Sequence, residues 1–292
     1  MFSIGPIPPN LVNDFNYCRQ VVRSHAENFP VGSRLAPRSI RPFLHAVYAF
    51  SRRADDFADA PGRQNFEKLM LLDDWGRRLE NARLGHTDHP IFRALAFTFS
   101  NTPLSIEHLR NLLIAFRMDV TNKRYDTLEE LAEYCQYSAN PIGRIVLSLA
   151  EEETPENLHW ADAICTALQL TNHLQDLGED VWKGRPLYLP REEMERFGVS
   201  EEMILQRRYT PTIGSLVISL VEQTRELFLV GEPLLKHVQW PLNLELAITW
   251  EAGMIILERI EMLGGNTFRT RPRLTGRDKA HCFWRAMGQV NR

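Results

Sequence analysis

Several features that mark large protein classes are scarce in this sequence. Its four cysteines form no C-x-x-C pair, and their spacings fit neither a zinc site nor a disulfide framework. The formal net charge is only −3, so no general excess of basic residues indicates a nucleic-acid partner. We therefore expect reduced thiols, a cytoplasmic location and no binding to nucleic acid.

Long apolar runs are missing too. The opening residues, MFSIGPIPPN, contain neither a basic start nor an extended apolar stretch, so we expect no signal peptide. The later segment GMIILERIEML is too short and too charged to cross a bilayer. No G-x-G-x-x-G motif follows a predicted strand, and we expect no nicotinamide cofactor.

Apolar residues do recur with a helical period along nearly the whole chain. Motifs rich in Pro and Gly separate the helical stretches, and no segment alternates with the period of two that marks a strand. The pattern predicts one all-α domain over residues 1–292, with a basic C-terminal segment over 269–292. The predicted helices lie near 11–27, 38–60, 64–84, 89–100, 105–122, 127–137, 141–150, 158–183, 200–231, 240–263 and 275–290.

One acidic stretch, RRADDFADAPG, follows the apolar residues of the predicted helix 38–60. Asp55 and Asp59 are four residues apart and extend the apolar stripe, so their carboxylates are expected to share the inward face. Like charges repel at this spacing and desolvation adds to the cost, whereas a divalent cation offsets both. Asp56 lies about 100° away round the helix, where it can pair with Arg52 or Arg53 or support the site. Alone, the pair fits a solvated helix end as well as a metal site.

A second acidic ladder favours the metal site. Asn172, Asp176 and Asp180 follow at four-residue intervals and continue the apolar stripe of the predicted helix 158–183. Magnesium prefers such oxygen donors and usually shares them with water and phosphate oxygens. Two ladders on two helices predict a facing pair around a cation cluster that binds a diphosphate. Direct contacts to that anion are expected from Arg52, and from Lys183 and Arg185 on a Gly-Arg-Pro loop that folds back over the site.

The segment after residue 268 is strongly basic. It carries two neighbouring aromatic residues, Phe283 and Trp284, and a single acid, Asp278. Basic charge beside aromatic rings suits contact with an anionic membrane surface. A solvated tail helix or an internal anion contact explains the same pattern, and both interpretations stay open. The basic residues of the stretch 269–287 are Arg269, Arg271, Arg273, Arg277, Lys279 and Arg285.

The motifs HAVYAFSRRADDFAD and QLTNHLQDLGEDVWKGRPLYLP together resemble the squalene and phytoene synthase family. NFPVGSRLAP and YCQYSANPIGRIVLSL add to the resemblance, which is closest to the bacterial hydroxysqualene synthase branch of hopanoid biosynthesis and runs from about residue 25 to 273. It implies a single-domain isoprenoid-synthase (terpenoid synthase) helical bundle around a central apolar cavity. Within that fold, several magnesium ions hold a prenyl diphosphate, and manganese is a substitute.

In this branch the implied reaction converts presqualene diphosphate and water to hydroxysqualene with release of diphosphate. An alternative is a head-to-head prenyl transferase that makes presqualene diphosphate, squalene or phytoene. A second alternative is a non-catalytic family member that acts as an assembly or binding protein. Because the product is apolar, peripheral contact with the inner face of the membrane is a further hypothesis, as is coupling to other enzymes of the squalene and hopanoid pathway.

The resemblance also implies residue roles. Asp55, Asp59, Asn172, Asp176 and Asp180 match the two metal motifs. The implied catalytic residues are Tyr48, Asp55, Asp59 and Asp176, and the implied substrate contacts are His25, Arg52, Tyr134, Gln169, Gln175, Lys183 and Arg185.

Three positions depart from the family pattern. Gln175 stands where many members have Arg, which removes one cation beside the diphosphate and fits a substrate with a single diphosphate. Ala26 replaces a common Ser and removes a hydroxyl contact. The loop GRPLYLP is one residue longer than the usual GRVYLP, which leaves the placement of Tyr188 open.

Overall fold

The computed structural model describes residues 6–24 and 36–290, and every regular element in those residues is a helix. This confirms the all-α fold class. The chain divides into two compact units, one made of residues 1–121 and 141–158 and the other of residues 122–140 and 159–292. The assignment of one domain to residues 1–292 stays a prediction. None of the described helices is long and apolar enough to span a membrane.

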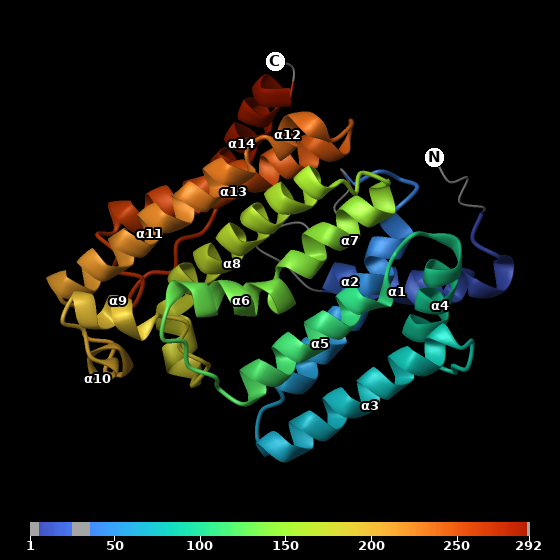
Figure 1. Cartoon of the computed structure of the whole chain (residues 1–292), viewed down its shortest axis with the longest axis horizontal. Coiled ribbons are helices and arrows are strands. Elements are labelled where there is room, and N and C mark those ends of the chain that lie inside the picture. Colours follow the sequence, from blue (N-terminus) through green and yellow to red (C-terminus); the bar gives the residue numbers. More distant parts are fainter. Residues whose placement is uncertain (1–5, 25–35, 291–292) are drawn as a thin grey trace. The chain divides into compact units, whose positions relative to one another are not determined.

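The first unit holds most of the N-terminal helices (Figure 1). Helix α2 lies against α1, α4 and α5, and α3 packs on α4 and α5. The elements are a 3₁₀ helix at Pro9–Leu11, α1 at Val12–Ser24, α2 at Arg41–Ala58, α3 at Asn65–Arg83, α4 at Pro90–Asn101, α5 at Ile106–Val120 and α7 at Asn140–Ala150, whose first residue is assigned to the other unit.

An aromatic core fixes α2 in the first unit. Phe50 is fully buried and stacks on Trp75, with ring centroids 5.8 Å apart. Trp75 lies 4.5 Å from the ring of Phe92 and donates from its indole nitrogen to the Phe50 carbonyl. Paired aromatic rings of this kind contribute about 0.5–1.5 kcal/mol beyond the apolar area they bury. The core therefore holds the helix that carries the first acidic ladder.

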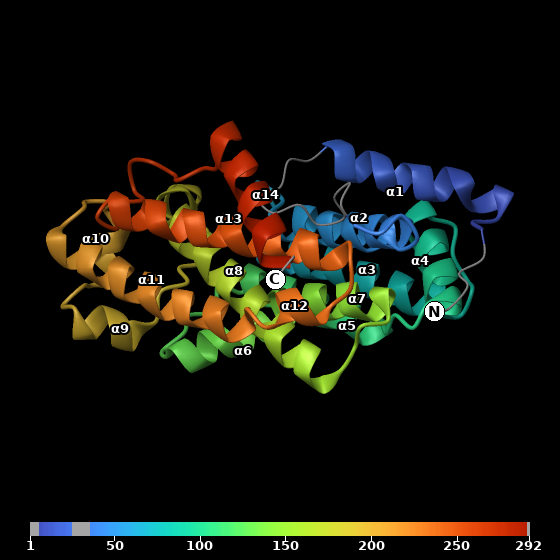
Figure 2. The same ribbon diagram turned by 90° about the horizontal axis from the view of Figure 1, so that it is seen from above.

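The second unit contains the long helix α8 and the neighbouring helices α13 and α14. Helix α13 contacts α11, α12 and α14, and Figure 2 shows α14 crossing beside it. The elements are α6 at Leu128–Ser138, α8 at Pro155–Lys183, whose first turn belongs to the other unit, α9 at Arg191–Arg196, α10 at Glu201–Leu205, α11 at Pro211–Gly231, α12 at Leu234–His237, α13 at Leu242–Met262 and α14 at Gly276–Val290.

The predicted helix 200–231 is wrong as a single element. Ser200 caps α10 by accepting from the amide of Met203, and the short helix ends before Arg207, which has a φ of 52°. Thr210 then caps α11 by accepting from the amide of Ile213, and Pro211 opens that helix. Both capping residues supply an oxygen to an otherwise unpaired amide, and Pro is favoured at the first helical position. The short helices α9 and α12 were also not predicted.

Candidate active site

The first acidic ladder lies at the C-terminal end of α2. Arg52 donates to Asp55 at 2.9 Å and pairs with Asp56 at 3.0 Å, while Arg53 lies 3.8 Å from Asp56. The predicted pairing of Asp56 with these two arginines is thus confirmed. Arg52 bridges the carboxylates of Asp55 and Asp56, so the residue predicted to contact the diphosphate lies beside Asp55, one of the predicted metal ligands.

Asp59 differs from its prediction. Helix α2 ends at Ala58, and Asp59 caps it with a backbone N–H donated to the Asp55 carbonyl at 2.8 Å. The i to i+4 spacing of the two acids is therefore kept. The prediction that their face points inward is wrong for Asp59, which is exposed, while Asp55 is only partly buried. The most buried face of α2 instead carries Phe50 and Ala54. Tyr48 is partly buried on the same helix.

The second ladder lies along α8 within the second unit. Asn172, Asp176 and Asp180 are all partly buried. Burial and, next, the neighbouring charge of Asp176 raise the pKa of Asp180 to about 6. In such an environment a nearby cation stabilises the charged form of the carboxylate. One such cation is Arg185, whose Nη1 lies 3.4 Å from Asp180.

The Gly-Arg-Pro loop after α8 does fold back, as predicted. Gly184 has a φ of 67°, a left-handed conformation that favours glycine. The turn brings the Arg185 amide within 2.9 Å of the Asp180 carbonyl and its guanidinium onto the Asp180 side chain. Lys183 instead pairs with Glu179 at 3.2 Å.

Asn172 provides a test of whether this ladder suits a metal ion. Its side-chain oxygen is buried and has no hydrogen-bond partner among the described residues. Leaving a buried acceptor unpaired costs about 1–3 kcal/mol. Together with the carboxylates of Asp176 and Asp180 it forms an all-oxygen donor set, which suits Mg²⁺ or Mn²⁺. Within each unit, no three His, Cys, Asp or Glu side chains of the described residues gather around one point as ligands, so a shared metal cluster stays a prediction.

A basic residue that had no predicted site role, Arg271, binds the carboxylate of Asp176. Arg271 directs Nε and Nη2 at the two oxygens of that carboxylate, with the Nη2–Oδ2 pair at 2.9 Å. Two parallel charged hydrogen bonds make this a strong, oriented contact, and it raises the pKa of Arg271. The open alternative of an internal anion contact for the basic segment is therefore realised here. Arg271 thus supplies a cation beside Asp176, and the loss of one cation beside the diphosphate at Gln175 stays a prediction.

Arg271 belongs to a strap, residues 267–273, that is fastened across α8. Buried Gln175 donates from its amide to the Pro272 carbonyl at 2.5 Å. A Cβ atom at Gly178 would lie 2.6 Å from the Thr267 oxygen, so only glycine admits the strap this closely. Gln175 is thus used to hold the strap, and the substrate contact predicted for it stays a prediction.

Two predicted substrate contacts lie in an aromatic group within the second unit. Tyr134 is buried, and its ring lies 5.4 Å from Tyr188. Tyr188 stacks on His173 with ring centroids 3.8 Å apart and planes 13° apart. The Gln169 amide nitrogen lies 3.3 Å from His173 Nε2. The stack on His173 defines the position of Tyr188, which the longer loop had left open in the sequence. It also adds His173 to the group, a residue that sequence reasoning missed.

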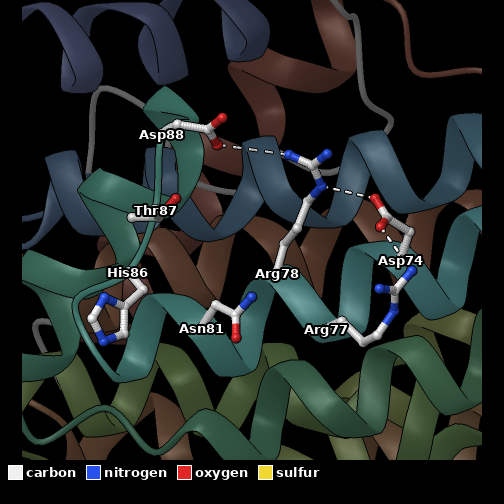
Figure 3. Close-up of a pocket in the computed structure, with 7 residues that line it drawn as sticks. All are labelled: Asp74, Arg77, Arg78, Asn81, His86, Thr87 and Asp88. Atoms are coloured by element: carbon white, nitrogen blue, oxygen red, sulfur yellow. Dashed lines mark hydrogen bonds and ion pairs between the residues drawn. The ribbon is translucent and has the colours of Figure 1, made fainter.

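A further pocket in the first unit is lined by none of the predicted site residues. Figure 3 shows a polar pocket of the first unit, where Arg78 lies between Asp74 and Asp88 and Arg77 also contacts Asp74. These charges pair with one another on an exposed surface formed by α3 and the residues that follow it. His25 and Ala26 lie outside the described residues.

Comparisons with known proteins agree with these observations. A family model described as squalene/phytoene synthase matches residues 22–278. A hydroxysqualene synthase of Rhodopseudomonas palustris is 35% identical over 76% of this chain and 75% of that protein. A 15-cis-phytoene synthase of Synechocystis is 33% identical over 88% of this chain and 79% of that protein. The solved structure of squalene synthase HpnC from Alicyclobacillus acidocaldarius has a TM-score of 0.83 at 38% identity, covering 89% of this chain and 97% of that one.

The fold therefore belongs to the all-helical class of terpenoid-synthase-like proteins. Within that class, the chain belongs to the squalene/phytoene synthase family. Hydroxysqualene synthases and phytoene synthases are both among its relatives.

Proposed function

We propose that this protein is a hydroxysqualene synthase, which converts presqualene diphosphate and water to hydroxysqualene and diphosphate with Mg²⁺ as cofactor. The observation that carries the proposal is the oxygen ladder on α8, where the buried Asn172 oxygen lacks a partner beside Asp176 and Asp180. A diphosphate needs metal ions between it and such acids. The 35% identity to a hydroxysqualene synthase supports the choice of reaction.

The chain's own residues have defined roles in this reaction. Asn172, Asp176 and Asp180, with Asp55 and Asp59, would hold the magnesium. When bound, Mg²⁺ neutralises charge on the leaving diphosphate and orients it. Arg52, Lys183, Arg185 and Arg271 are the cations available to pair with the same anion.

Substrate ionisation breaks the carbon–oxygen bond, and the electron pair leaves with diphosphate. The rearranged carbocation then gains oxygen from water, which loses a proton. Aromatic faces such as those of Tyr134 and Tyr188 stabilise a nearby cation by about 0.5–2 kcal/mol each. Their apolar surroundings also keep other water away from the cation.

A head-to-head prenyl transferase is the second candidate. It is favoured by the phytoene synthase relative and by Arg271, which provides a cation that a second diphosphate would require. Its substrate would be two identical or similar prenyl diphosphates rather than one presqualene diphosphate. A non-catalytic assembly role is the third candidate, although it has no need of two acidic ladders.

The direct test is incubation of the purified protein with Mg²⁺ and presqualene diphosphate, without a nicotinamide. We expect release of diphosphate and formation of hydroxysqualene. Turnover of farnesyl diphosphate alone would support the second candidate instead, and a tight protein complex without any turnover would support the third. Normal turnover in excess chelator would exclude the metal role.

Variants test the ladders separately. Asp176→Asn and Asp59→Asn should each lower kcat by about a hundredfold, since metal stabilisation of the leaving group is worth several kcal/mol. Asp74→Asn, which alters an exposed acid pair on α3, is the matched control and should leave kcat unchanged. Full activity in Asp176→Asn would contradict the assignment of the second ladder.

We also propose that the enzyme works at the inner face of the membrane, in contact with other enzymes of squalene and hopanoid biosynthesis. The chemical reason is that an apolar C30 product has low solubility in water and needs an acceptor phase. The surface expected to make this contact is treated in the Discussion.

A further inference from the structure

His173 lies on α8 among residues with assigned roles. It follows Asn172 directly and is four residues after Gln169, so the imidazole and the Gln169 side chain share one face of the helix. Asp176 follows three residues later on the same face. The stripe that carries the oxygen ladder therefore also carries an imidazole to which neither the metal nor the diphosphate motif assigns a role.

The contact between Gln169 and His173 fixes the direction of an amide. The two nitrogens, Gln169 Nε2 and His173 Nε2, are 3.3 Å apart. An amide NH₂ group only donates, so the ring nitrogen must accept, and the ring carries its proton on Nδ1. The other end of the amide, the Gln169 oxygen, then points away from the imidazole. No hydrogen bond to that oxygen occurs among the described residues.

Stacking holds the imidazole in the orientation that this contact requires. Tyr188 covers one face of the ring at 3.8 Å, with the planes only 13° apart. Tyr134 lies 5.4 Å from Tyr188 and 6.1 Å from His173. Rotation of the imidazole would break the stack and carry its Nε2 atom away from Gln169. Tyr188 on one face and the Gln169 amide at the edge therefore hold the ring in this orientation.

We propose that His173 is a positioning residue, which orients the Gln169 amide so that its free oxygen holds the water that captures the substrate cation. This inference rests on the proposed function and names the groups that act on its last step. The Gln169 oxygen accepts a hydrogen bond from the water. A lone pair of the water oxygen is then available to attack the cationic carbon.

The capture step balances in atoms and charge. The water oxygen forms a bond to the cationic carbon, and one water proton leaves to the released diphosphate, which is the base that ionisation provides. Gln169 neither gains nor loses a proton. His173 keeps its own proton on Nδ1 throughout, so its contribution is to geometry alone.

Two substitutions separate the parts of this arrangement. His173→Phe keeps a ring that can stack on Tyr188 but removes the acceptor. His173→Gln removes the ring but places an amide oxygen near the original Nε2 position. His237→Phe is the matched control, because His237 also packs on an aromatic ring, that of Trp160 at 4.4 Å, away from this group.

The readout is the ratio of hydroxysqualene to other apolar products per diphosphate released from presqualene diphosphate. We expect His173→Phe to lower this ratio about three- to tenfold, the effect of losing one hydrogen bond, with little change in KM. His173→Gln should restore at least half of the ratio, and His237→Phe should equal the wild type. If wild-type protein makes hydroxysqualene and His173→Phe keeps the same ratio, the inference fails while the proposed function stands. Equal losses in both His173 variants would also overturn it.

A second measurement needs no substrate. In ¹⁵N-histidine NMR spectra of the wild type, the signal that His173→Gln removes should show a protonated Nδ1 and an unprotonated Nε2. A Gln169→Leu variant should shift that Nε2 resonance. An imidazole protonated on Nε2 in the wild type would overturn the inference, whatever the products are. If no variant or wild-type protein turns over presqualene diphosphate, the proposed function fails instead.

Discussion

At the scale of single residues, the imidazole of His173 has an unusual acid–base property. Burial lowers its pKa from 6.5 to about 3. The unfolded chain therefore binds a proton that the folded chain does not over this range, and stability falls as pH drops below 6.5. Above pH 6.5 the contribution is fully present. We expect the free energy of unfolding in urea to decrease more between pH 7 and pH 5 in the wild type than in His173→Phe.

The control for this prediction is Glu156→Gln, an exposed substitution in the first turn of α8, which should keep the wild-type slope. Although His173 has some exposed surface, it lines a small apolar recess with Leu174 and Tyr188 rather than facing open solvent. An identical pH slope in wild type and His173→Phe would contradict the buried neutral imidazole.

Arg271 gives a second prediction at this scale. Its guanidinium holds both oxygens of Asp176, so a metal ion must displace it from that carboxylate. Arg271→Gln should therefore tighten Mg²⁺ binding about tenfold, because a hydrogen bond to a charged group no longer competes. Isothermal titration calorimetry without substrate measures this directly. Arg277→Gln, on the exposed side of α14, should leave the affinity unchanged, and weaker Mg²⁺ binding in Arg271→Gln would contradict the competition.

At the scale of elements, the strap and α8 approach so closely that a glycine is required. A Cβ atom at Gly178 would lie 2.6 Å from both the Thr267 oxygen and the Phe268 Cα. Gly178→Ala should therefore destabilise the protein by about 1–3 kcal/mol, as overpacking does. Gly288→Ala is the control, since a Cβ there meets nothing within 4 Å, and it should stabilise α14 by up to about 1 kcal/mol. Denaturant unfolding compares the two, and equal stabilities would contradict the close approach.

At the scale of the whole molecule, α14 presents a surface suited to a membrane. Cys282 and Ala286 are buried on one side of this helix, whereas Phe283 and Trp284 are 38% and 72% exposed on the other. Basic residues of the same helix, such as Lys279, can attract anionic lipid, and aromatic rings favour the bilayer interface. The two rings pack edge to face at 5.9 Å, so they form one apolar patch.

Co-sedimentation with vesicles tests this surface. We expect the full chain to bind vesicles rich in anionic lipid and to ignore zwitterionic ones. The double variant Phe283→Ser, Trp284→Ser should bind about tenfold less or weaker still, since burying one aromatic side chain contributes about 1.5–3 kcal/mol. Phe66→Ser, which alters a ring that is 63% exposed on α3, is the control. Unchanged binding in the double variant would contradict a membrane role for α14.

Much of the fold could be predicted from the sequence because helices are defined by local rules. The 3.6-residue period placed Asn172, Asp176 and Asp180 on one face, and capping residues such as Ser200 and Thr210 mark where helices begin. The same locality allowed one clear error, the single helix over 200–231. There the apolar pattern continues on both sides of residues 206–210, while the capping of Thr210 and the proline after it divide the element.

The acidic ladders and their helices were thus determined by the sequence alone, through spacing along a helix. The tertiary structure decided what those residues touch. Arg271 reaches Asp176 across 95 positions of sequence, because Gly178 and Gln175 fasten the strap to α8. Likewise, Tyr188 meets His173 only after the loop turns at Gly184. Such contacts depend on how separate segments pack, and no local period or spacing carries that information.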